Sequence, residues 1–494
     1  MAANSSKKGN SAVRAAAGIA TVAATIAALY FLYFASYIGA AVQWISALAV
    51  LAISGMLLRM LFSLHGGYGI YMLSSSRGIG TIHRIARDHR AFWDALALWG
   101  LVLGFGILAW PLLKGRISKR LYAFGVVSVA FIMLFIVPFL SYSVIFINIP
   151  SLQRFTSAVQ PLPSPAQYVS SVLGGDIITY ALRAVTVIAG FTGYMFYLLA
   201  LNSYNILVSV AASVSAASIA PLSSQVAGVA PLIPGLDTPL FAGIIALIVI
   251  LVVHEFSHGI LASMLKVRLK SIGLLMFGLV PVGAFVEPDE KQVAKLPVMG
   301  QNKILAAGVS SNFLLMLVFF VPMLLMVPYV VGHIYQQSVV ITGTISGYPA
   351  YNVVQVGSQV ISWNGYKVMN LTGFESFASK EDPGSTIRLV TSAGAYTFTS
   401  QAYNGSSRGL IGIEVGSVSK AVTPSFGDKA VYFFYTLFAL LFMLNFLVAV
   451  VNFLPLPGLD GWRIYSASIG NKHFVHALTY IVLFLLLVNV LPWL

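Results

Sequence analysis

The sequence has few charged residues. Only 9% of its 494 residues are Asp, Glu, Lys or Arg, whereas 58% are hydrophobic. A soluble globular chain carries about 25% charged residues, so this chain has too little charge to cover a surface that faces water. The shortage of charge excludes an ordinary soluble protein and predicts an integral membrane protein.

The sequence also has no cysteine. This absence excludes disulfides, thiolate nucleophiles and every metal site with Cys ligands, so any metal must be held by His, Asp or Glu. The charges that are present are unbalanced, because 28 Lys and Arg against 14 Asp and Glu give a net charge of +14. In a membrane protein such an excess is typical of cytoplasmic loops, so nucleic acid is not expected as a partner.

Nine apolar segments are long enough to cross a bilayer, which takes about 20 residues as a helix. A stretch rich in Ala and Ser, residues 205–238, is expected to be a loop rather than a tenth span. The sequence therefore predicts a polytopic α-helical protein of about nine spans, embedded in the lipid bilayer of the cell membrane. The segments lie near residues 15–36, 38–63, 92–113, 121–147, 177–204, 239–264, 303–330, 430–454 and 473–494.

The one long polar segment is residues 333–428, and its pattern predicts a small β-rich domain. One hairpin is expected to turn at Asn364-Gly365, a pair that favours the type I′ turn. A second is expected to turn at residues 392–394, with a short helix over LTGFESFAS between the two hairpins and a further strand at 410–415.

The strongest chemical motif is the pentapeptide HEFSH, residues 254–258. On a helix, His254 and His258 lie on one face and can bind one zinc ion, while Glu255 can act as the general base toward a water molecule. The motif lies in an apolar run of about 26 residues, or roughly 39 Å of helix. Ionisable groups are costly in such a setting, which makes them candidates for function.

A catalytic zinc usually has three protein ligands, so a third His, Asp or Glu is needed. Asp460 stands out because it lies in the apolar segment NFLPLPGLDG, residues 452–461. Pro455, Pro457 and Gly458 are expected to break the helix before it, and broken helices within a membrane line cavities or are buried in protein. From these residues alone, Asp460 is either the third ligand or a residue of a turn at the membrane boundary.

Together, HEFSHG at 254–259 and NFLPLPGLDG at 452–461 resemble the two signatures of the site-2 protease family of intramembrane zinc metalloproteases. Further resemblance is found in PGLDTP, PVGAFVEP and AAGVSSNFLLML, and the whole match covers roughly residues 230–494. The resemblance implies one Zn²⁺ per chain held by His254, His258 and Asp460, with Glu255 as catalytic base. It also implies that Asn312 and Asn452 contact substrate or hold the catalytic helices.

The segment PVGAFVEP has two interpretations. Its residues alone favour a plain loop leaving the membrane. The resemblance implies instead a strand that binds an unwound substrate through Gly283, Ala284, Phe285 and Val286. A helix hides its carbonyls in internal hydrogen bonds, so a protease must unwind it and can pair it as an added strand.

The inserted segment resembles a PDZ domain, with Pro349-Ala350 before a turn, then Gly357 and Asn364-Gly365. In this family such a domain is expected to limit substrate access by size, and a generic β-rich domain is the alternative. The expected organisation has four regions: an N-terminal multi-span membrane region of unknown role (1–230), the first segment of the catalytic membrane core (231–332), the PDZ-like extracytoplasmic domain (333–428) and the second segment of the catalytic membrane core (429–494).

The sequence thus predicts an intramembrane zinc endopeptidase that cleaves transmembrane segments of other proteins in regulated intramembrane proteolysis. One alternative is a membrane zinc protease of the prenyl-protein or heat-shock type, which takes a glutamate as third ligand. Another is a divalent-cation transporter with His and Asp sites, because intramembrane ionisable groups also mark ion pathways. The substrate and the oligomeric state are open.

Overall fold

The computed structural model describes residues 2–34, 40–113, 115–138, 177–219, 238–330, 335–369, 371–402, 408–421 and 425–493, with single positions between 222 and 234. These residues form two compact units. The first unit contains Met1–Val321 and Thr436–Leu494, and the second contains Pro322–Tyr435. The domain limits expected from the sequence remain predictions.

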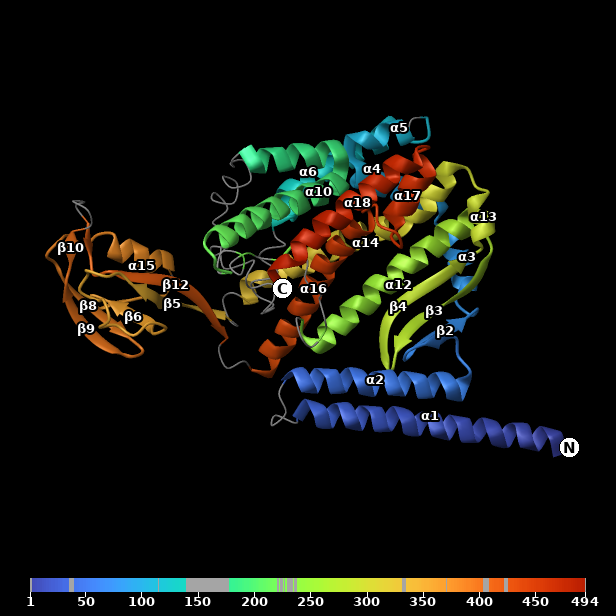
Figure 1. The fold of residues 1–494 in the computed structure, drawn as a ribbon, viewed down its shortest axis with the longest axis horizontal. Coiled ribbons are helices and arrows are strands. Elements are labelled where there is room, and N and C mark those ends of the chain that lie inside the picture. Colours follow the sequence, from blue (N-terminus) through green and yellow to red (C-terminus); the bar gives the residue numbers. More distant parts are fainter. Residues whose placement is uncertain are drawn as a thin grey trace. The chain divides into compact units, whose positions relative to one another are not determined.

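Long helices dominate the first unit (Figure 1). Nine helices of the described residues are long and apolar enough to cross a membrane, and each coincides with one of the nine predicted segments. These helices and the shorter ones are α1 Ala2–Phe34, α2 Ala40–Phe62, α3 Ile79–Asp88, α4 Arg90–Phe105, α5 Trp110–Leu113, α6 Lys119–Phe131, α10 Ile177–Ser215, α12 Leu240–Met264, α13 Glu290–Ala294, α14 Val298–Tyr329, α16 Phe426–Asn452, α17 Asp460–Ser468 and α18 Lys472–Val490.

Helix α10 extends beyond the predicted segment. The expectation of a loop from residue 205 is wrong for 205–215, which continue the helix. Within 205–215, Leu207, Ala211 and Ala212 are good helix formers, and α10 packs on α18 just before this stretch. In that contact the Asn202 amide donates to Oδ1 of Asn489 at 2.7 Å, and Asn489 is fully buried. Residues 220, 221 and most of 223–237 lie outside the described residues.

A four-stranded antiparallel sheet lies against α12. Its order is β1 Gly66–Gly67, β2 Ile70–Ser75, β3 Leu269–Phe277 and β4 Val280–Pro288, so that β4 is at one edge among the described strands. Strand β2 pairs with β3 from Ile70 opposite Phe277 to Ser75 opposite Ile272. The sheet therefore joins segments that are about 200 residues apart in the sequence, and Figure 1 shows β3 and β4 alongside α12.

Strand β4 corrects the loop interpretation of PVGAFVEP. The segment is paired with β3 through Phe285 opposite Gly273 and Ala284 opposite Leu274. Pro281 and Gly283 are disfavoured inside a strand, and the register shifts beside them, between Leu275 and Met276 of the partner strand. The pairing with β3 satisfies one side of the β4 backbone and thereby outweighs the local turn signals.

The second unit contains a sheet with the order β12-β5-β6-β8-β9, and β7 pairs with β6. Both predicted hairpins are confirmed: Asn364 and Gly365 have φ of 50° and 85°, as a type I′ turn requires, and β8 pairs with β9 through Thr391 opposite Gly394. The strand expected at 410–415 is interrupted: Leu410 ends the short strand β11, and β12 begins at Ile413, after Gly412 with a φ of 79°. The elements are β5 Tyr335–Thr344, β6 Gln359–Trp363, β7 Tyr366–Lys367, α15 Leu371–Ala378, β8 Thr386–Thr391, β9 Gly394–Thr399, β10 Gln401–Ala402, β11 Gly409–Leu410 and β12 Ile413–Ala421.

Candidate metal centre

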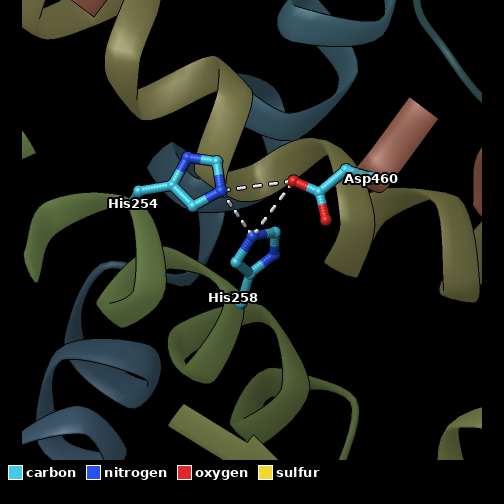
Figure 2. A group of neighbouring side chains, drawn as sticks. All are labelled: His254, His258 and Asp460. Atoms are coloured by element: carbon cyan, nitrogen blue, oxygen red, sulfur yellow. Dashed lines mark hydrogen bonds and ion pairs between the residues drawn. The ribbon is translucent and has the colours of Figure 1, made fainter. Parts of the chain in front are cut away.

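Three predicted ligands meet in the first unit (Figure 2). His254 and His258 are one turn apart on α12, and their Nε2 atoms are 3.1 Å apart. Oδ2 of Asp460 lies 3.2 Å from Nε2 of His254 and 3.3 Å from Nε2 of His258. The helical i, i+4 spacing predicted for the histidines therefore brings both rings to one carboxylate.

The hydrogen bonds of His258 leave its Nε2 free to bind a metal. Its Nδ1 lies 2.7 Å from the carbonyl oxygen of Ile304, which can only accept, so Nδ1 carries the ring proton. The Nε2 lone pair then points toward His254 and Asp460. A metal-binding histidine normally donates its other N–H to such a partner, which fixes the ring orientation.

His254 has a partner of the same kind in Asn312 on α14. Nδ1 of His254 lies 3.1 Å from the Asn312 amide, which is fully buried. When Nε2 binds a metal, Nδ1 carries the proton and needs an acceptor, and the amide supplies one when its oxygen faces the ring. Asn312 therefore lies where it can orient His254.

Asp460 is positioned by a break between two helices, as the sequence predicted. Helix α16 ends at Asn452 and α17 begins at Asp460, and Gly458 between them has a φ of 95°. The Thr479 hydroxyl of α18 holds this break by donating to the Pro455 carbonyl at 2.8 Å. Gly461 lies against the backbone of Phe453, where any side chain would collide, so Asp460 can stand at the start of α17 next to α12.

The chemistry of these three side chains fits zinc. Ligands about 2.0–2.1 Å from a tetrahedral zinc are roughly 3.3 Å from one another, close to the separations found here. Oδ2 of Asp460 is buried and receives no hydrogen bond from the described residues. Two nitrogen lone pairs and a carboxylate oxygen so close together repel one another unless a cation lies among them.

Gly308 of α14 provides the space beside these ligands. A Cβ atom at this position would lie 2.5 Å from Nε2 of His258 and 2.7 Å from Nε2 of His254. The absence of a side chain therefore keeps the ligand atoms accessible from α14. Sequence reasoning did not single out Gly308, although the run of small residues AAGVSS around it is a signal for close helix packing.

Glu255 contacts the edge strand of the sheet. The backbone N–H of Val286 donates to Oε2 of Glu255 at 3.3 Å. The strand comes this close because residue 259 of α12 is glycine, and a Cβ there would lie 2.8 Å from Cγ1 of Val286. Strand β4 and the carboxylate next to His254 are thus in direct contact.

At the end of the same strand, Glu287 is tied to β3. Its carboxylate accepts from the Ser271 hydroxyl at 2.9 Å and from Nζ of Lys270 at 3.3 Å. The Ser271 hydrogen bond, assisted by Lys270, holds the pKa of Glu287 below its ordinary value. The carboxylate therefore stays ionised at neutral pH and keeps this bond to β3.

The N-terminal half of the chain supports α14 at the site. Lys303 of α14 directly precedes Ile304. Its Nζ lies 2.7 Å from Oδ1 of Asp94 on α4. Gly100 of α4 lies directly against Ser310 of α14, so that no larger residue fits there. These contacts were not predicted, since no local pattern at Asp94 or Gly100 indicates a partner about 200 residues away.

The other predicted site residues differ in their relation to the cluster. Gly283, Ala284, Phe285 and Val286 lie on β4, and Val286 reaches Glu255. Asn452 lies at the end of α16, and its amide donates to the Val448 carbonyl of its own helix at 2.9 Å. Asn452 is therefore near the break that precedes Asp460. Its side-chain amide donates its hydrogen bond to its own helix and not to any of the three ligands.

A cluster of two histidines and an aspartate on apolar helices, with a glutamate beside it, defines the class of membrane metallopeptidases. A sequence profile of peptidase family M50 matches residues 242–489, half of the chain. The chain belongs to this family, the site-2 protease family of zinc metalloproteases. It is an integral membrane protein, as its apolar helices and its family indicate.

The chain is also similar to an uncharacterized protein of Methanocaldococcus jannaschii, MJ0971. The two are 29% identical over 232 residues, which are 46% of this chain and 57% of that protein. The chain thus matches less than two thirds of the length of this relative. The similarity adds no activity, because none is described for that protein.

Proposed function

We propose that this protein is an intramembrane zinc endopeptidase that cleaves transmembrane segments of other membrane proteins, as in regulated intramembrane proteolysis. The observation that carries the proposal is the convergence of His254, His258 and Asp460, with Glu255 beside them on α12. We further propose that the protein acts in the cell membrane.

His254, His258 and Asp460 would hold one Zn²⁺ per chain, through Nε2, Nε2 and Oδ2. Bound zinc would supply Lewis acidity toward the scissile carbonyl and toward water. Ile304 and Asn312 would keep both imidazoles in the tautomer that leaves Nε2 free. Their contacts at 2.7 Å and 3.1 Å support this role.

Glu255 would be the general base. Its carboxylate would take a proton from the attacking water and then give it to the nitrogen of the leaving amine. A base of this kind must keep a fixed direction toward the reacting atoms. The hydrogen bond from Val286 supplies such a restraint on one carboxylate oxygen.

Strand β4 would bind the substrate as an added strand. In an antiparallel ladder successive N–H groups point alternately toward the partner strand and away from it. The N–H of Val286 points away from β3, to Glu255, so the N–H and carbonyl of Ala284 also face the free edge. An unwound substrate would pair with Ala284 and reach the metal ligands near Val286. Asn452 would contact the substrate near the metal ligands.

The second unit would act as a PDZ-like domain that limits access by size. Its support is the resemblance around Pro349 to Gly365 and the confirmed hairpins. The alternative of a prenyl-protein or heat-shock type protease requires a glutamate as third ligand, whereas the carboxylate beside both histidines belongs to Asp460. A divalent-cation transporter is disfavoured by the membership in a peptidase family.

The proposal is tested by incubating the purified full chain with a model membrane helix, before and after removal of metal with a chelator. We expect cleavage to stop on metal removal and to return when Zn²⁺ is added back. Zinc-dependent cation flux in vesicles without any cleavage would favour the transporter instead. Cleavage that persists after complete metal removal would refute the proposed mechanism.

A further inference from the structure

Helix α3 has one buried face and one basic face. Ile82 and Ala86 are 0% and 4% exposed and pack in the apolar cluster beside α12, whereas Arg84 and Arg87 are exposed. Arg77, just before the helix, is exposed as well. This division shows that α3 packs its apolar face on the rest of the protein and turns its basic face outward.

The neighbours of α3 place it level with the ends of two candidate spans. Helix α4 begins at Arg90, directly after α3, and Nδ1 of His83 lies 2.6 Å from Oγ of Ser263 in the last turn of α12. Both α12 and the segment Arg90–Leu113, which begins with α4, are long and apolar enough to cross a membrane. Because the ends of spanning helices lie near the headgroups, we expect the basic face of α3 at the depth where lipid headgroups meet water.

Two exposed basic residues follow α12, next to the apolar cluster in which α3 packs. Lys266 and Arg268 are exposed on either side of Val267, which is buried in the same apolar cluster as Ile82. We call Arg77, Arg84, Lys266 and Arg268 the α3 basic surface. None of the four forms an ion pair with another described residue, whereas Arg87 pairs with its neighbour Asp88 at 3.0 Å.

We propose that the α3 basic surface binds the headgroups of anionic phospholipids in the bilayer that holds the protein. Arg and Lys side chains that lie at headgroup level bind phosphate oxygens through charge-assisted hydrogen bonds. Each such residue strengthens attraction to an anionic membrane surface by about fivefold. The charge of the surface and its depth are the two observations that select a lipid as partner.

Headgroup binding at this surface acts on the helix that carries the metal ligands. Ile82 packs beside Gly259, where a Cβ would lie 3.2 Å from Cδ1 of Ile82, and Gly259 follows His258 directly. A lipid that holds α3 against α12 therefore stabilises the end of the metal helix. Lipid binding is independent of peptide cleavage, so a stability measurement can test it even if the proposed function fails.

The test uses the full chain in a neutral detergent, titrated with short-chain phosphatidylglycerol or with phosphatidylcholine while the unfolding temperature is measured. We expect phosphatidylglycerol to raise the midpoint of the wild type and phosphatidylcholine to leave it nearly unchanged. In the double variant Arg84→Glu/Arg268→Glu, the same rise requires at least tenfold more phosphatidylglycerol. The rise in unfolding temperature that phosphatidylglycerol causes in the wild type also becomes smaller in high salt, because exposed charges are screened.

A matched control variant, Lys367→Glu/Lys380→Glu, reverses the charge of two exposed lysines of the second unit. Its unfolding temperature should respond to phosphatidylglycerol as that of the wild type does. The milder Arg84→Gln/Arg268→Gln variant keeps the test valid if the charge reversal fails to fold, and it should show a smaller displacement in the same direction. Equal titrations of wild type and both α3 variants would overturn the proposal. An equal rise with inorganic phosphate alone, or with phosphatidylcholine, would also overturn it.

Discussion

The backbone N–H of Val286 donates a hydrogen bond to Oε2 of Glu255 at 3.3 Å. This contact links the edge strand of a sheet to the carboxylate that is proposed to move the proton. The same strand is proposed to pair with the substrate. Binding of a substrate strand and orientation of the base are therefore expected to depend on neighbouring atoms of one segment, Ala284 to Val286.

Replacing Val286 with proline removes the N–H that faces Glu255. The N–H points away from β3, so proline is tolerable at this edge. A hydrogen bond to a charged group contributes about 1.5–3 kcal/mol, so we expect kcat to fall by about 10- to 100-fold with zinc content unchanged. Steady-state kinetics with a model membrane helix and metal analysis of the purified variant check this.

Two further variants separate the contributions of this strand. Val286→Ala keeps the N–H and removes only side-chain packing, against Gly259 and the apolar cluster around Ile82, so its kcat should stay near that of the wild type. Ala284→Pro removes the other outward N–H and should raise KM rather than lower kcat. If Val286→Ala loses as much kcat as Val286→Pro, packing and not the hydrogen bond orients the base.

Gly308→Ala should prevent metal binding. The added Cβ would lie 2.5 Å from Nε2 of His258, closer than carbon and nitrogen atoms approach without displacement. Alanine is a better helix former than glycine by about 1 kcal/mol, so a loss of zinc would not come from weakened helix propensity. We expect zinc content, measured by elemental analysis, to fall to a small fraction of one ion per chain.

Gly300→Ala on the same helix is the matched control for Gly308→Ala. The nearest atom to a Cβ at Gly300 is 3.4 Å away, an ordinary contact, so this variant should keep its zinc. Full zinc content in Gly308→Ala would show that the ligand cluster does not need the open space beside α14.

Asn312→Ala should weaken metal binding without removing a ligand. The amide is 3.1 Å from Nδ1 of His254 and is proposed to fix the ring in its metal-binding tautomer. Loss of such a partner typically lowers metal affinity 10- to 100-fold. Competition with a zinc chelator of known affinity measures the change.

The control for Asn312→Ala is Asn445→Ala, which removes an equally buried amide from α16 that donates to the Leu441 carbonyl of its own helix. Both variants lose packing and stability, but only Asn312→Ala should lose zinc affinity. A similar loss of zinc affinity in both would mean that Asn312 acts through packing alone.

The metal ligands could be predicted from the sequence because their geometry is local. His254 and His258 need only one turn of helix, and the helix break before Asp460 is encoded by Pro455, Pro457 and Gly458. The same holds for the hairpin at Asn364-Gly365. The meeting of Asp460 with the histidines is not local, and it was expected from the family resemblance rather than from spacing.

The features that sequence reasoning missed depend on distant partners. Residues 280–288 form a strand because β3 pairs with them, and β3 is itself paired with β2 from the N-terminal region. Gly308 matters because α12 and α14 lie close together, and the Lys303–Asp94 ion pair joins helices about 200 residues apart. Local patterns contain none of these contacts.

The most direct measurement compares wild type with Glu255→Gln in zinc content and in cleavage of a model membrane helix. Glutamine keeps the size of the side chain and can still accept from Val286, but it cannot take a proton. We predict one zinc ion per chain in both proteins and a loss of cleavage of about 100- to 10,000-fold in the variant. A Glu255→Gln protein that cleaves as fast as the wild type would contradict the proposed mechanism.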